Sequence, residues 1–183
     1  MPDRVELKNM AKEQIKGNIG ILFIVLLLTA LITGTAIGSI ATPVINIGVC
    51  LIYINMTKGI KPSVLDMFNR IDTFLKALWL AIVTGFFTML WSFLLIIPGI
   101  IKGLSYSMGP YIMAEHPEWT AMQCLEESKR IMRGNILSLF ILQLSFLPWA
   151  LLVTVTFGIA SVYVVPYVSA TTANFYNAIK QGS

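Results

Sequence analysis

Residues 17–57, GNIGILFIVLLLTALITGTAIGSIATPVINIGVCLIYINMT, contain no charged side chain. One bilayer crossing takes roughly 20 apolar residues as a helix, so this stretch is long enough for two crossings. Two later stretches have the same character: residues 77–114 contain one charge, Lys102, and residues 134–179 contain none. The sequence therefore predicts an all-α, polytopic membrane protein with six transmembrane helices arranged as three hairpins. The expected turns lie near 38–43, 98–99 and 150–157, where Gly, Ser and Pro interrupt the apolar runs.

The composition of the whole chain agrees with a membrane environment. Of the 183 residues, 56% are hydrophobic and 12% are charged, whereas a soluble domain has about 25% charged residues. The basic residues gather between the apolar stretches and not on one compact face, so the net charge of +4 does not indicate a nucleic-acid-binding protein. We therefore treat residues 1–183 as a single membrane domain.

The distribution of Lys and Arg predicts the orientation. Twelve of the 13 lie in the N-terminal segment, in the segments after the second and fourth expected crossings, and in the tail. Since Lys and Arg near membrane ends are retained in the cytoplasm, both termini of this multi-pass membrane protein are expected there. A cleaved signal peptide over residues 1–41 is disfavoured, because Ile19 to Ile40 exceeds an h-region of about 7–15 residues.

A short charged segment precedes each expected hairpin. Each begins with a helix-capping pair, and apolar residues at helical spacing follow. The pairs are Asp3 with Glu6, Ser63 with Asp66, and Thr120 with Gln123. We therefore expect three cytoplasmic amphipathic helices in the headgroup layer or against the bundle.

Two junctions between such a segment and a hairpin repeat in sequence. Residues 16–19 are KGNI and residues 133–136 are RGNI, an offset of 117 residues. The middle unit keeps only the cation, Lys76. The spacing predicts three degenerate repeats, 3–57, 63–114 and 120–178, with the outer two more alike. At each outer junction the Gly is expected to end the first helix in the left-handed conformation, and the Asn to cap the next helix.

A set of residues in the second half resembles a known family pattern. The set is Ile97-Pro98-Gly99, Tyr106, Pro110, Glu115, Ala121, Ser128 and Arg133-Gly134-Asn135. It resembles the bacterial integral membrane family called domain of unknown function family 975, which is similar to the membrane domain attached to some glycerophosphoryl diester phosphodiesterases. The resemblance implies a six-helix membrane module without assigned catalytic residues. The phosphodiesterase activity does not carry over, because the sequence contains no catalytic barrel.

Four polar residues in the apolar stretches form the candidate intramembrane site: Lys102, Asn46, Gln143 and Asn174. Ionisable groups within a membrane are functional candidates by default. Lys102 has two open interpretations, since its long side chain can extend to the outer interface or face the bundle and attract an anion. Interhelical hydrogen bonding is the simpler account of the amides.

Lys16, Lys76 and Arg133 are candidate contacts for lipid headgroups, because each lies where a charged segment meets an apolar one. Catalytic chemistry has little support. His116 is the single histidine, and Glu115 beside it lacks a second ligand or base at a suitable spacing. Cys50 and Cys124 suggest neither a disulfide nor a metal site. We therefore expect no catalytic residues, metal or cofactor.

The sequence favours a non-enzymatic membrane protein with a lipid-interacting or envelope-assembly role. Its expected partners are membrane lipids, further copies of the chain or other envelope proteins, and not nucleic acid. The alternative is a small transporter or channel for an anionic or amphipathic solute, supported by the repeat, by Lys102 and by Gly103, Gly109 and Pro110, which can break the fourth crossing. A polar cavity at mid-membrane would favour transport, whereas a dry apolar interior would favour the first role.

Overall fold

The computed structural model describes residues 3–94 and 96–181, and these residues form helices and no strands. The α-helices are α1 (Arg4–Ile15), α2 (Ile19–Thr33), α3 (Ala36–Thr57), α4 (Phe74–Leu94), α5 (Ile96–Tyr106), α6 (Gly109–Glu115), α7 (Ala121–Met132), α8 (Ile136–Leu144), α9 (Leu147–Val155) and α10 (Ser161–Gln181). Two 3₁₀ turns, η1 (Val64–Phe68) and η2 (Ile71–Thr73), precede α4.

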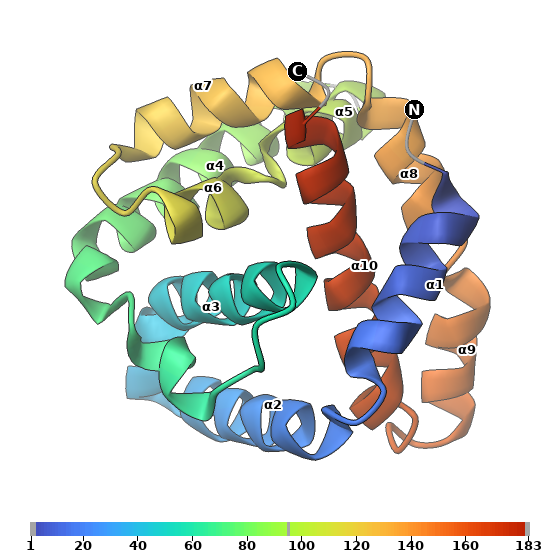
Figure 1. Ribbon diagram of the computed structural model, residues 1–183. Coiled ribbons are helices and arrows are strands. Elements are labelled where there is room, and N and C mark those ends of the chain that lie inside the picture. The colour runs from blue at the N-terminus through green and yellow to red at the C-terminus, as the bar shows by residue number, and fades with distance from the viewer. Residues whose placement is uncertain (1–2, 95, 182–183) are drawn as a thin grey trace.

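Helix α3 lies at the centre of the molecule (Figure 1), in contact with α2, α4, α6 and α10. Its Ile47, Ile52 and Ile54 are almost completely buried. Helix α10 packs against α1 and α3, and α7 packs across α4, α5 and α6. Close packing of these apolar side chains holds the helices together.

Three segments among the described residues are long and apolar enough to cross a membrane: Ile40–Thr57, Val64–Leu90 and Ile136–Val155. Helices α1 and α2 together pass the same test but meet at an angle of 92°. The all-helical class is therefore confirmed, together with apolar helices of spanning length. The expected six crossings go beyond these segments and belong to the proposal below.

Two of the three expected turns lie elsewhere. The break between α2 and α3 comes at residues 34–35, and Pro43 lies inside α3. Helix α4 ends at Leu94 and α5 begins at Ile96, so Pro98 falls in the first turn of α5. A proline is tolerated there because the first-turn N–H groups have no partner within the helix. The third expected turn is nearly correct, since α9 ends at Val155 and residues 156–160 form the turn.

The expected amphipathic α-helix of the middle unit is not formed. The Ser63 side chain makes no capping hydrogen bond, and η1 and η2 replace the helix. Gly48 of α3 gives the physical reason, because a Cβ there would lie 2.1 Å from the Met67 carbonyl oxygen. The backbone of η1 thus rests directly on α3. Tertiary packing therefore decides the local structure here.

The other two capping pairs differ from one another. Thr120 and Gln123 form the complete capping box at the start of α7. Asp3 accepts a hydrogen bond from the Val5 N–H, which caps α1 without the reciprocal Glu6 contact.

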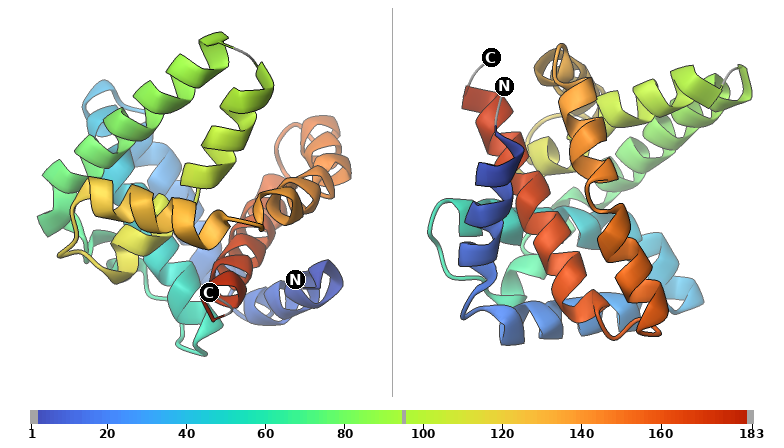
Figure 2. Two further views of the ribbon diagram at one scale, coloured as in Figure 1. Left: turned by 90° about the horizontal axis from the view of Figure 1, so that it is seen from above. Right: turned by 90° about the vertical axis from the view of Figure 1, so that its right-hand side faces the viewer.

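Several helix ends lie on the side of the molecule opposite the start of α1 and the end of α10 (Figure 2). In both views of Figure 2 the α2–α3 turn, the end of α4 and the start of α5 lie away from the C-terminal end of α10 and the start of α1. Helices α4 and α5 run side by side along their length.

Candidate functional site

The structure does not bring the four intramembrane candidates together in one site. Asn174 is buried in α10, and its amide exchanges two hydrogen bonds with Gln14 of α1, at 2.9 and 3.0 Å. Asn174 therefore forms the interhelical hydrogen bonds that were the simpler interpretation of the amides. Asn46 of α3 is exposed and borders a cavity with α4 and α6. Gln143 is exposed on α8, and Lys102 is half-buried on α5.

The two outer junctions share one geometry. Gly17 and Gly134 have φ angles of +89° and +85°, the left-handed conformation expected from the sequence. The chain accordingly ends one helix and begins another at each junction. Lys16 and Arg133 are the exposed residues immediately before these glycines.

The prediction that the junction asparagines cap the following helix is wrong, because their side chains bond to the preceding helix. Neither Asn18 nor Asn135 caps the helix that follows it. Each side-chain amide instead donates back to the carbonyl four residues earlier, that of Gln14 at 2.9 Å and that of Ile131 at 3.0 Å. The amide thus satisfies a carbonyl at the C-terminus of the preceding helix, which would otherwise lack a donor.

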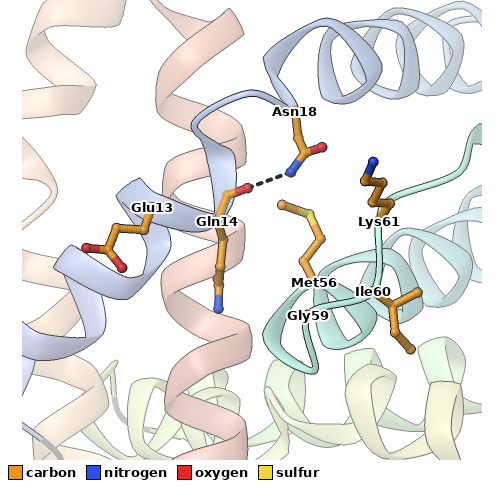
Figure 3. A pocket seen from close by; sticks show the side chains of 7 residues that line it. All are labelled: Glu13, Gln14, Asn18, Met56, Gly59, Ile60 and Lys61. Atoms are coloured by element: carbon orange, nitrogen blue, oxygen red, sulfur yellow. Dashed lines mark hydrogen bonds between the residues drawn. The ribbon is translucent and has the colours of Figure 1, made fainter.

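A pocket of about 280 Å³ with both polar and apolar lining residues lies beside the first junction. Figure 3 shows Asn18 on the α2 side of this pocket, with Lys61 across it on the loop that follows α3. The dashed line marks the bond from Asn18 to the Gln14 carbonyl. This junction therefore combines a bend with an accessible ammonium group and an amide.

Lys76, the third candidate for headgroup binding, is held within the protein. Its ammonium group donates to the carbonyls of Pro117 and Glu118, at 2.9 and 3.1 Å. Arg70 donates to the neighbouring Ala114 carbonyl at 3.0 Å. Two cations of the middle unit thus anchor residues 114–118, and Lys76 is less free to meet lipid than Lys16 or Arg133.

An ion cluster that the sequence analysis missed is centred on Glu115, at the end of α6. Its carboxylate accepts from Lys58 at 2.8 Å, from Lys180 at 2.6 Å and from the Tyr176 hydroxyl at 2.7 Å. The cluster therefore ties together the C-terminal ends of α3, α6 and α10. A signal was present, because Lys58, Glu115 and Lys180 each directly follow an apolar stretch. In the predicted topology, all three stretches end on the same side of the membrane.

Burial and hydrogen bonding act in opposite directions on Glu115. Burial raises its pKa, but hydrogen bonds from Lys180, Lys58 and Tyr176 outweigh this and lower the pKa to about 2. The carboxylate therefore stays ionised at neutral pH. It acts as an acceptor that holds three helix ends, and it has no proton to give.

His116 packs against its own loop. Its ring stacks on Trp119 with centroids 4.4 Å apart, and its Nδ1 lies 3.2 Å from the Glu118 carboxylate. Within residues 3–94 and 96–181, no group of three or more His, Cys, Asp or Glu could hold a metal ion.

An apolar groove of about 430 Å³ begins next to the second junction. It is lined by Ile100, Ile101 and Leu104 of α5 and by Ile136, Leu137 and Phe140 of α8. Arg133 is exposed three residues before Ile136. A cationic group and an apolar groove thus follow one another along the chain.

Comparison with known proteins identifies one family. No curated protein and no solved structure matches the chain. The expected similarity to a phosphodiesterase membrane domain gains no support from these comparisons. Residues 93–183, however, match the model of the family described as Protein of unknown function (DUF975). The chain is therefore a member of the domain of unknown function 975 family.

Proposed function

We propose that the protein is a non-enzymatic, multi-pass protein of the bacterial plasma membrane that binds anionic lipids at its cytoplasmic face. One observation carries the proposal, the uncovered apolar surface of the candidate spans. Only 17% of the span Ile136–Val155 is buried inside the protein, and Leu137 and Leu151 are 63% and 66% exposed. Such a continuous surface is unfavourable in water and favourable in hydrocarbon.

The proposal keeps six crossings with both termini in the cytoplasm. The positions of the cations support this orientation. The arrangement in Figure 2 also supports it, because the α2–α3 turn, the end of α4 and the start of α5 lie away from the start of α1 and the end of α10. Assembly with further copies or with other envelope proteins is compatible with the same exposed apolar faces.

The anionic lipid is proposed to bind at the second junction. Arg133 would meet the phosphate. The groove between α5 and α8, which begins three residues further along the chain at Ile136, would hold an acyl chain. Lys16 offers an equivalent cation at the first junction, where Gly17 has the same backbone conformation as Gly134. The ionised Glu115 supports a role without acid–base catalysis, because its low pKa makes it a poor proton donor.

A titration with defined lipids tests this proposal. The purified protein would be delipidated mildly and titrated with phosphatidylglycerol or phosphatidylcholine, with bound lipid counted by native mass spectrometry. Arg133→Gln and Lys16→Gln should each weaken phosphatidylglycerol binding roughly fivefold, since one cation near the surface contributes about 1 kcal/mol. Arg4→Gln is the matched control, because Arg4 is an exposed cation that precedes neither junction glycine. Equal binding of both lipids, or an equal loss in all three variants, contradicts the proposal.

A transporter of an anionic or amphipathic solute is the second candidate function. The break between α5 and α6 at residues 107–108 favours it, since interrupted helices line many transport sites. The core argues for the first candidate, because it consists mainly of Leu, Ile, Met and Ala side chains. The buried polar side chains of the described residues all have hydrogen-bond partners.

A further inference from the structure

The cavity that Asn46 borders has a volume of about 350 Å³ and lies between α3, α4 and the α5–α6 break. Its size falls at the lower end of small-molecule sites, which span about 300–1,000 Å³. Apolar side chains form most of its wall, among them Ile47, Leu80 and Ala77. Three polar side chains, Asn46, Thr84 and Ser107, also line it. None of the residues that line it is charged.

The break between α5 and α6 borders this cavity. Helix α5 ends at Tyr106 and α6 begins at Gly109. Pro110 has no N–H, so it cannot donate the hydrogen bond that the Tyr106 carbonyl would receive in a continuous helix. Both Tyr106 and Pro110 line the cavity. Irregular backbone within a membrane is tolerated where it faces a cavity or the protein interior.

The polar side chains of the cavity lie near the mid-length of membrane-spanning helices. Asn46 lies close to the middle of α3 (Ala36–Thr57), and Thr84 lies at the middle of α4 (Phe74–Leu94). The contact that the structure gives the Asn46 amide is weak, a 4.0 Å approach of the Cys50 thiol to its oxygen. An amide at this depth gains from a hydrogen-bonding ligand, because hydrocarbon offers none.

We propose that this cavity binds a neutral amphipathic lipid with one small hydrogen-bonding head, such as a monoacylglycerol. The hydroxyl or ester of the lipid would lie between Asn46 and Thr84, and its chain would follow Ile47 and Leu80. An anionic head is disfavoured, since no cation lines the cavity and an unpaired charge at mid-membrane is costly. This inference rests on the proposed function only in that the chain spans the membrane.

Photo-crosslinking in native membranes tests the site. The probes are a diazirine-bearing monoacylglycerol and a diazirine-bearing phosphatidylglycerol, with labelled peptides identified by mass spectrometry. Gly85→Leu should fill the cavity without disturbing the backbone, because a Cβ at Gly85 meets no atom within 4 Å. Gly20→Leu is its matched control, since a Cβ at Gly20, on α2, also meets nothing within 4 Å. Asn46→Leu removes the amide, and Gln143→Leu is the control for losing an exposed amide.

The expected result is labelling of α3, α4 and α6 by the monoacylglycerol probe, reduced roughly tenfold by Gly85→Leu and Asn46→Leu and unchanged by both controls. Labelling spread evenly over α2, α8 and α9, or equal labelling by both probes at the cavity, overturns the inference. Unchanged labelling in Gly85→Leu does the same. Failure of the proposed function is a separate outcome, because the wild-type protein would then be absent from the membrane fraction or indifferent to phosphatidylglycerol.

Discussion

The two outer repeats, 3–57 and 120–178, enter their apolar helices in a different way from the middle repeat, 63–114, although the sequence predicts three similar repeats. At residues 15–19 and 132–136 the chain turns by a local code, a glycine at positive φ and an asparagine that donates back to the preceding helix. Residues 63–76 lack this code and form two 3₁₀ turns held by distant partners. These partners are Gly48 of α3 and the carbonyls of residues 114–118. A local motif can thus specify a bend, whereas its absence leaves the conformation to tertiary packing.

The largest expected effect lies in the middle unit, at Gly48. Gly48→Ala would place a Cβ 2.1 Å from the Met67 carbonyl oxygen, so η1 must move off α3. Clashes of this kind in a packed core typically cost about 1–3 kcal/mol, and a backbone clash belongs at the upper end. Thermal unfolding in detergent would measure the loss.

Gly85→Ala is the control for that substitution, because its new Cβ meets nothing within 4 Å. In the interior of α4 it should stabilise the helix by about 0.5–1 kcal/mol. Equal stability of the two variants would mean that η1 does not rest on α3 as described.

The next effect concerns the long-range contacts around Glu115. Glu115→Gln should lower the free energy of unfolding by about 2 kcal/mol, since it removes a largely buried carboxylate whose lysine partners remain partly in water. The pKa of Glu115 falls from 4.5 to about 2 on folding. The contribution of the carboxylate is therefore complete above pH 4.5 and is lost as the pH falls toward about 2.

Unfolding measured between pH 5 and pH 2 would test this dependence. The wild type should lose stability over that range more steeply than Glu115→Gln. Glu126→Gln, at an exposed position on α7, should keep the wild-type slope. Parallel curves for the wild type and Glu115→Gln would show that the cluster does not hold the helix ends together.

The features predicted correctly from the sequence depend on neighbours along the chain. The absence of charge over residues 17–57 predicts apolar helices, and Gly17, Gly134 and the Thr120 cap predict local conformations that the structure confirms. A glycine before each asparagine allows the positive φ angle that ends the helix. Such a prediction uses only residues that are adjacent in sequence and does not require knowledge of the tertiary structure.

The features that were mispredicted or missed depend on distant partners. Pro43 was expected in a turn, yet α3 continues through it. The segment after Ser63 becomes 3₁₀ turns because it lies on Gly48. The Glu115 cluster joins residues 57 and 65 positions apart. None of these contacts leaves a periodic pattern in the sequence, although the shared position of the three charges after apolar stretches was an available signal.

The smallest expected effect tests the local code itself, at the two glycines of positive φ. Gly17→Ala and Gly134→Ala should each lower stability by about 1–2 kcal/mol, because a Cβ disfavours the left-handed conformation. Neither new Cβ would meet an atom within 4 Å, so the cost comes from the backbone alone. Gly20→Ala is the control, since it adds the same methyl group within α2 and should stabilise the helix slightly.

If the two junctions are specified by the same local sequence, the stability losses of Gly17→Ala and Gly134→Ala should agree within about 0.5 kcal/mol and add in the double variant. A loss at Gly134 alone would mean that α1 is oriented by its packing on α10 and not by the junction, and the likeness of the two outer units would then be one of sequence only.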